Sequence, residues 1–69
     1  MKAPHETIKM QIRRLRQAKG WRQQDLASKA GVTQAFVSQL EAGLKKNPGV
    51  VSLLRIAKAL GVTIEDLVK

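Results

Sequence analysis

The residue types that most often carry catalysis or bind a metal are nearly missing from this chain. It has one histidine, His5, and no cysteine, so neither a zinc site nor a pair of nucleophile and base can be assembled. Glu65 and Asp66 are adjacent, and we expect them to serve a helix end rather than to act as an acid–base pair. The sequence therefore predicts no enzymatic activity, no metal and no cofactor, and it shows no pocket for a small-molecule effector.

A different chemistry fits residues 34–42 in the middle of the chain, which have the pattern of a short helix. Val37 and Leu40 are three residues apart and would face the core. The side chains left pointing away from the core are uncharged: Gln34, Ala35, Ser38 and Gln39. A glutamine amide can bond the edge of an adenine through two hydrogen bonds, and a small alanine can lie against a thymine methyl group. This face is suited to reading DNA bases.

The charge of the chain favours a polyanionic partner. The 69 residues carry 13 basic and 5 acidic side chains, a net charge of +8, which favours nucleic acid or an anionic membrane surface. The membrane is the weaker alternative, because basic and apolar residues divide among several short helices instead of forming one long amphipathic helix. No apolar run is long enough to span a bilayer, and no secretory signal is present. We therefore expect the cytoplasm.

The elements that must position the base-reading face are short helices. Apolar spacing and helix-ending residues predict an all-α fold with one domain, residues 1–69, and helices at about 4–19, 23–30, 34–42, 50–60 and 64–68. Gly31 is expected in the turn between the second and third helices with a positive φ. Thr33 is expected to cap the third helix, and Thr63 the last one, in a reciprocal arrangement with Asp66.

Two short helices joined by a tight glycine turn, inside a basic all-helical domain, form a helix-turn-helix arrangement. The stretch GWRQQDLASKAGVTQAFVSQLEAG, residues 20–43, resembles the Cro/cI-type (lambda repressor-like, XRE) helix-turn-helix family. The resemblance continues through NPGVVSLLRIAKALGVTIEDL and covers about residues 8–68. It implies a five-helix domain whose third helix enters the major groove of double-stranded DNA.

The resemblance also assigns roles to individual residues. Gln34, Ala35, Ser38 and Gln39 match positions that read bases, although Gln34 could instead brace Gln23. The residues that it places at the phosphate backbone are Arg22, Gln23, Thr33, Phe36, Lys45, Lys46 and Asn47. For Phe36, packing into the core is the open alternative. Arg16 and Glu41 match a structural ion pair that joins the first helix to the third.

Arg22 is a departure from the family, which usually has a capping serine or asparagine before the second helix. Losing that cap costs about 1 kcal/mol, and the arginine offers a phosphate contact in its place. Phe36 is a second departure, since it lacks the hydroxyl of the tyrosine found there in some members.

The sequence thus predicts a transcriptional repressor that binds a near-palindromic operator as a dimer, with half-sites about 34–36 Å apart. Four apolar residues not needed for the predicted core are candidates for the dimer contact: Val51, Leu54, Ile64 and Val68. Burial within the monomer explains some of them equally well. Any dimer should be small and weak, and binding to DNA could be what holds it together. The alternative is an antitoxin or adaptor module that binds a partner protein, but such a module would need an additional segment for its partner, and we expect none.

Overall fold

The structure confirms the predicted all-α fold of five short helices. It is a computed structural model that describes residues 7–44 and 48–68, and this described part contains helices and no strands. The helices are α1 (Thr7–Ala18), α2 (Gln23–Ala30), α3 (Gln34–Glu41), α4 (Val50–Leu60) and α5 (Ile64–Val68). Residues 4–6, expected to open the first helix, lie outside the described residues. Helix α1 ends one residue before the expected Lys19, and Ala42 follows α3 as its C-cap.

Every helix contributes one fully buried side chain to a single core. Ile12, Leu26, Val37, Ile56 and Leu67 come from α1 to α5 in order, and each has an exposed fraction of 0%. Burying a branched aliphatic side chain stabilises the fold by about 1.5–3 kcal/mol. The shared core therefore holds each helix in place, which short helices need because they are marginal in isolation.

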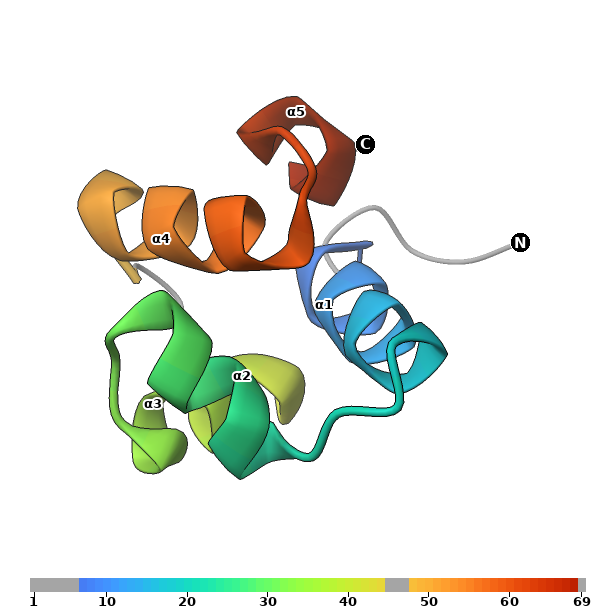
Figure 1. Cartoon of the computed structure of the whole chain (residues 1–69). Helices are drawn as coiled ribbons and strands as arrows, with labels where there is room; N and C mark the ends of the chain where they lie inside the picture. The colour runs from blue at the N-terminus through green and yellow to red at the C-terminus, as the bar shows by residue number, and fades with distance from the viewer. Residues whose placement is uncertain (1–6, 45–47, 69) are drawn as a thin grey trace.

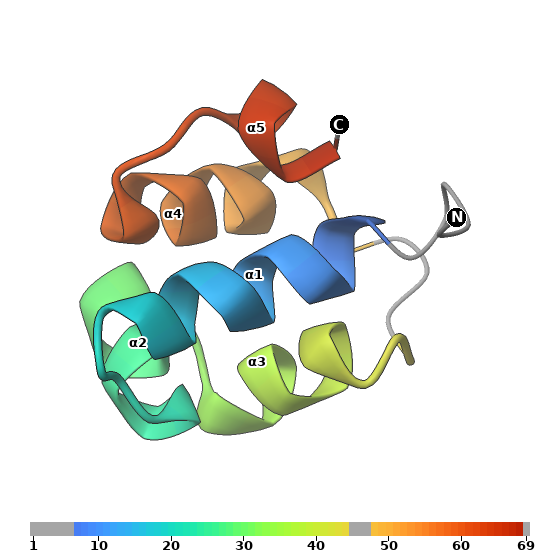
Figure 2. The same ribbon diagram turned by 90° about the vertical axis from the view of Figure 1, so that its right-hand side faces the viewer.

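The helices are arranged around α1, which crosses the middle of the molecule (Figure 2). Helix α1 packs against α3 on one side and α5 on the other, and α2 packs against both α3 and α4. As a result α2 and α3 form one end of the domain, and α4 and α5 form the opposite end (Figure 1). A contact made at the outer surface of α3 is therefore supported by α1 and α2 together.

The turn between α2 and α3 is built as the sequence predicts. Gly31 has a φ of 71°, and its N–H donates to the carbonyl of Ser28 over 3.3 Å. Thr33 caps α3, since its hydroxyl oxygen accepts from the N–H of Phe36 over 3.0 Å. Ala27, which has an exposed fraction of 3%, belongs to the buried core. The small side chain of Ala27 lets α2 and α3 approach each other closely.

Helix α5 begins with a reciprocal cap formed by two side chains. Thr63 accepts from the N–H of Asp66, and Asp66 accepts from the N–H of Thr63, both over 3.1 Å. This is the reciprocal cap that was predicted for the last helix. It sets the start of α5 so that Leu67 points into the core.

Candidate nucleic-acid interface

The outer face of α3 carries the uncharged side chains that the sequence analysis singled out. Val37 and Leu40 are buried, with exposed fractions of 0% and 3%. The four residues between and beside them are exposed: Gln34, Ala35, Ser38 and Gln39. Because the buried pair fixes the rotation of α3, these four side chains share one outward surface. Their role in reading bases remains a prediction.

The start of α2 lacks a side-chain cap from Arg22, as the sequence analysis expected. Arg22 has the extended backbone of an N-cap residue, and its side chain makes no capping hydrogen bond. The carboxylate of Asp25 compensates in part, because it accepts from the N–H of Arg22 over 2.8 Å. The Arg22 guanidinium also lies 3.7 Å from that carboxylate, but it is 83% exposed. Its positive charge therefore remains available at the surface.

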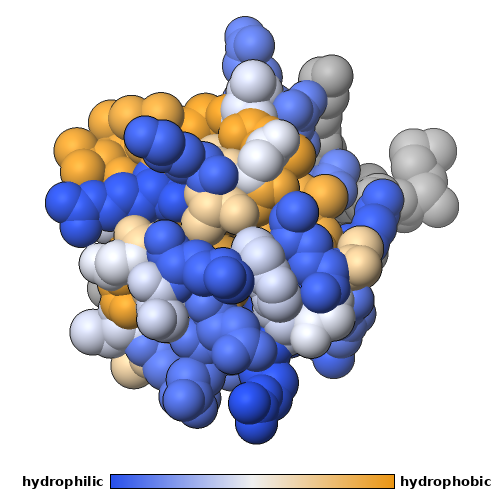
Figure 3. All heavy atoms as spheres, in the orientation of Figure 1, coloured by the Kyte–Doolittle hydropathy of each residue, from blue (hydrophilic) through white to orange (hydrophobic). Residues whose placement is uncertain are grey.

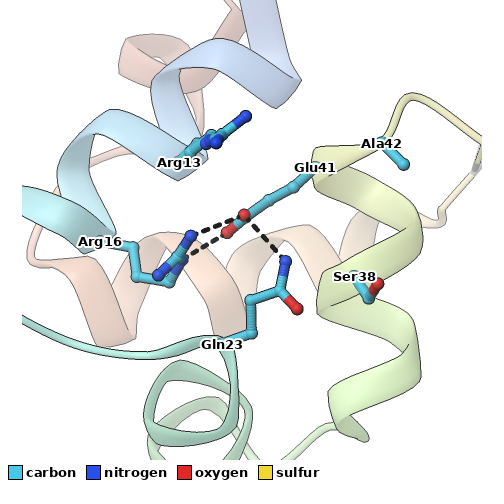
Figure 4. Close-up of a pocket in the computed structure, with 6 residues that line it drawn as sticks. All are labelled: Arg13, Arg16, Gln23, Ser38, Glu41 and Ala42. Atoms are coloured by element: carbon cyan, nitrogen blue, oxygen red, sulfur yellow. Dashed lines mark hydrogen bonds and ion pairs between the residues drawn. The ribbon is translucent and has the colours of Figure 1, made fainter.

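Arg16 and Glu41 form the predicted link between α1 and α3. The Arg16 Nε and Nη2 donate to the two carboxylate oxygens of Glu41 over 2.6 and 2.9 Å (Figure 4). A third bond runs from Arg16 Nη1 to the carbonyl of Trp21 over 2.8 Å. Both side chains are at least nine-tenths buried. The hydrogen bond to Glu41 raises the pKa of Arg16, against the opposing effect of burial.

Glu41 has a second partner that the sequence analysis missed. The side-chain amide of Gln23 donates to Glu41 Oε1 over 3.1 Å (Figure 4). The residue that braces Gln23 is thus Glu41; bracing by Gln34 was the alternative to its role in base reading. One N–H of the amide is used in this bond, and the other remains to donate to a ligand. The two residues are 18 positions apart, and no local pattern in the sequence pairs them.

An open polar hollow lies where α1, α2 and α3 meet. Its volume is about 240 Å³, and its lining residues are Arg13, Arg16, Gln23, Ser38, Glu41 and Ala42. Figure 4 shows Arg13 projecting from α1 toward the end of α3, with Ser38 on the facing helix. Because Ser38 also belongs to the exposed face of α3, the hollow adjoins the candidate base-reading surface.

The other residues predicted to contact phosphate differ in how exposed they are. Thr33 is exposed, and its hydroxyl serves as the cap of α3. Phe36 is half-buried and packs against the core, so the core-packing alternative accounts for part of its surface. Lys45, Lys46 and Asn47 lie outside the described residues. For all five, contact with phosphate remains a prediction.

The candidate dimer residues do not share one environment. Val51 and Leu54 on α4 are 61% and 52% exposed, whereas Ile64 is half-buried and packs against the core. The side chain of Val68 lies outside the described part. Two further apolar residues that the sequence analysis did not select are exposed, Leu44 at 73% and Val50 at 64%. The exposed residues of α4 contribute to the hydrophobic area over this helix in Figure 3.

Other kinds of site find little support in the described residues. Across residues 7–44 and 48–68, no three histidine, cysteine or acidic side chains gather where they could hold a metal ion. None of the helices described by the structure has the length and apolar character needed to cross a membrane.

Comparison with known proteins identifies the family. A family model described as helix-turn-helix matches residues 12–67. The chain is 42% identical over 55 residues to y4dJ of Sinorhizobium fredii, an uncharacterized HTH-type transcriptional regulator, covering 80% of this chain and 70% of y4dJ. It is 33% identical over 60 residues to the HTH-type transcriptional regulator SinR of Bacillus subtilis, covering 87% of this chain and 54% of SinR.

The structure is also similar to that of SinR, the master regulator for biofilm formation, solved in complex with DNA. The TM-score is 0.85 at 32% identity, with 90% of this chain and 98% of that chain covered. The chain therefore belongs to the helix-turn-helix family of the Cro/cI (XRE) type, a family of DNA-binding transcription regulators and not of enzymes. It spans about half the length of SinR.

Proposed function

We propose that this chain is a transcriptional repressor that binds a near-palindromic operator as a dimer, with α3 in the major groove. The observation that carries the proposal is the outward face of α3. Gln34 and Gln39 are exposed on a helix whose rotation is fixed by buried Val37 and Leu40. Glutamine amides match the donor and acceptor pattern of an adenine edge in the major groove. A regulator of this kind acts on the chromosome, which in a bacterium lies in the cytoplasm.

Phosphate contacts flank this face in the proposal. Arg22 keeps an exposed guanidinium at the start of α2, and the adjacent Gln23 keeps a free amide N–H beside it. Lys45, Lys46 and Asn47 follow α3 in the sequence. Such contacts position the protein on the duplex without reading its sequence. Because each neutralised phosphate releases counterions, affinity should fall steeply as salt is raised.

The dimer contact that we propose is an apolar patch made of Leu44, Val50, Val51 and Leu54. All four are exposed by more than half, and exposed apolar surface on a small protein often marks a protein–protein contact. Leu44 follows α3, and the other three residues belong to α4. A weak dimer of this kind would be completed by binding two half-sites about one helical turn apart.

The direct test is selection of bound duplexes from a randomised pool at about 0.15 M salt, followed by sequencing. We expect enrichment of two inverted half-sites one helical turn apart. Placing the selected site within a promoter, upstream of a reporter gene, should then lower transcription when the protein is present. A pool that stays random would mean that charge alone holds DNA, and it would favour the antitoxin or adaptor alternative. A rise in transcription would overturn the repressor role.

A further inference from the structure

The hollow between α1, α2 and α3 contains one cation that no other group neutralises within the described part of the chain. Arg16 and Glu41, which line it together, compensate each other through two hydrogen bonds. Both oxygens of Glu41 are occupied, because Oε1 also accepts from Gln23. Arg13 lines the same hollow, is exposed, and forms no ion pair with a described residue. The hollow therefore carries a net positive charge.

We propose that this hollow binds a phosphate of the DNA backbone, with Arg13 as its charged ligand. The second donor is the amide N–H of Gln23 that Glu41 leaves unused. An arginine fork and an amide can both donate to the oxygens of one phosphate, and bonds from a guanidinium are about twice as strong as neutral ones. The inference rests on the proposed function, because it needs a duplex held by α3.

The position of the hollow supplies the reason for a backbone phosphate. Ser38 lines the hollow and also lies on the exposed face of α3. A duplex whose major groove receives that face must run one of its strands along the side of α3. Arg13 projects from α1 toward the end of α3 (Figure 4). The hollow, about 240 Å³, is several times the roughly 30 Å³ that one water occupies in the liquid. The hollow is therefore larger than the space that a single water fills.

The neighbouring residue gives a matched control. Arg14 is also exposed on α1 and carries the same charge, but it is not part of the hollow. Arg13→Gln and Arg14→Gln therefore remove the same charge from adjacent positions of one helix. Arg13→Lys keeps the charge at the hollow. Since both arginines are exposed, none of these variants should change the melting temperature, which circular dichroism can check.

The first measurement is the dependence of binding on salt, with the duplex selected from the random pool. We expect Arg13→Gln to reduce the slope of log K against log salt by about 0.9, the value for one phosphate contact. Arg14→Gln and Arg13→Lys should keep the slope of the unaltered chain. Equal losses in Arg13→Gln and Arg14→Gln would overturn the proposal, because they would reflect general charge only.

The second measurement locates the phosphate. Duplexes carrying one uncharged methylphosphonate linkage, moved stepwise along the half-site, are bound by the unaltered chain and by Arg13→Gln. At the linkage that Arg13 contacts, the unaltered chain should bind the uncharged duplex more weakly than the normal one. Arg13→Gln should bind the two duplexes equally, because the substitution and the uncharged linkage remove the same interaction. If the loss of affinity caused by Arg13→Gln adds to the loss caused by the uncharged linkage at every position, Arg13 does not contact any of these phosphates. If the unaltered chain binds no duplex, the proposed function itself fails; if it binds and Arg13→Gln behaves like Arg14→Gln, only this inference fails.

Discussion

Glu41 joins residues of α1 and α2 to α3 beside the candidate interface. It accepts two hydrogen bonds from Arg16 and one from Gln23, so it compensates a buried cation and orients an amide at the start of α2. A buried ion pair adds little net stability over apolar residues of the same size, but losing one partner leaves an uncompensated charge. The pair is therefore better explained by the geometry that it imposes on Gln23 than by stability.

Removing the carboxylate should be strongly destabilising. We expect Glu41→Ala to lower the free energy of unfolding by about 3–5 kcal/mol, because Arg16 is left buried without its partner. Urea unfolding followed by the fluorescence of Trp21 measures the loss. The double variant Arg16→Met, Glu41→Leu should recover most of the stability and still bind DNA more weakly, since Gln23 has lost its brace. A double variant that binds as tightly as the unaltered chain would disprove the positioning role of Glu41.

The glutamines on α3 should control sequence preference. We expect Gln39→Ala to weaken binding by about 1–3 kcal/mol and to relax the preference at one base pair, whereas Lys46→Ala should weaken all sequences about equally. A panel of duplexes with single base changes separates the two behaviours. If Gln39→Ala keeps the same preferred sequence, the face assigned to base reading is not the one that meets the bases.

At the scale of the element, α2 begins with a residue that gives the helix no side-chain cap and carries an exposed charge. Arg22 has the backbone of an N-cap but no capping side chain, and Asp25 supplies one half of the usual reciprocal cap. A serine at this position would complete it, because its hydroxyl could accept from the N–H of Asp25. The arginine instead places an exposed charge beside Gln23.

The variant Arg22→Ser should therefore separate stability from binding. We expect it to raise the free energy of unfolding by about 1 kcal/mol and to lower the salt dependence of DNA binding by about one phosphate contact. Thermal unfolding and binding at several salt concentrations measure the two effects. Arg22→Ala, which removes the charge without adding a cap, is the control and should lose binding without gaining stability. Unchanged salt dependence in both variants would show that Arg22 does not reach a phosphate.

At the scale of the whole molecule, two ends of the domain have different surfaces. Helix α3 presents uncharged polar side chains at one end, and α4 presents Val50, Val51 and Leu54 at the other. Figure 3 shows hydrophobic surface over α4. A small dimer interface of a few apolar residues gives little affinity by itself. The two-fold contact should matter mainly when both copies are already bound to neighbouring half-sites.

Leu54→Gln tests this arrangement without changing the charge. We expect unchanged binding to a duplex with one half-site and weaker, less cooperative binding to the full operator, because the dimer contact adds affinity only when two copies are adjacent. Ala18→Gln, at an exposed position near the end of α1, is the control and should leave both affinities unchanged. Equal binding of Leu54→Gln and the unaltered chain to the full operator would rule out the patch as the dimer contact.

Local rules in the sequence were enough to predict the all-α fold and the face of α3. The spacing of Val37 and Leu40 sets which side of α3 is buried, and Gly31 and Thr33 define the turn before it. Each of these signals acts over fewer than about five residues, the range of one helical turn or cap. They can therefore be identified from a short stretch of sequence, although the helices themselves need the shared core to be stable.

Apart from the Arg16–Glu41 pair, which the family resemblance predicted, only the tertiary structure showed which distant residues meet. The bond from Gln23 to Glu41 and the hollow that joins Arg13 to Ser38 depend on how α1, α2 and α3 cross. The same holds for apolar residues of similar type, since Ile64 packs against the core while Leu44 and Val50 are exposed. Periodicity assigns a residue to one face of its own helix, but only the placement of the other helices determines whether that face is covered.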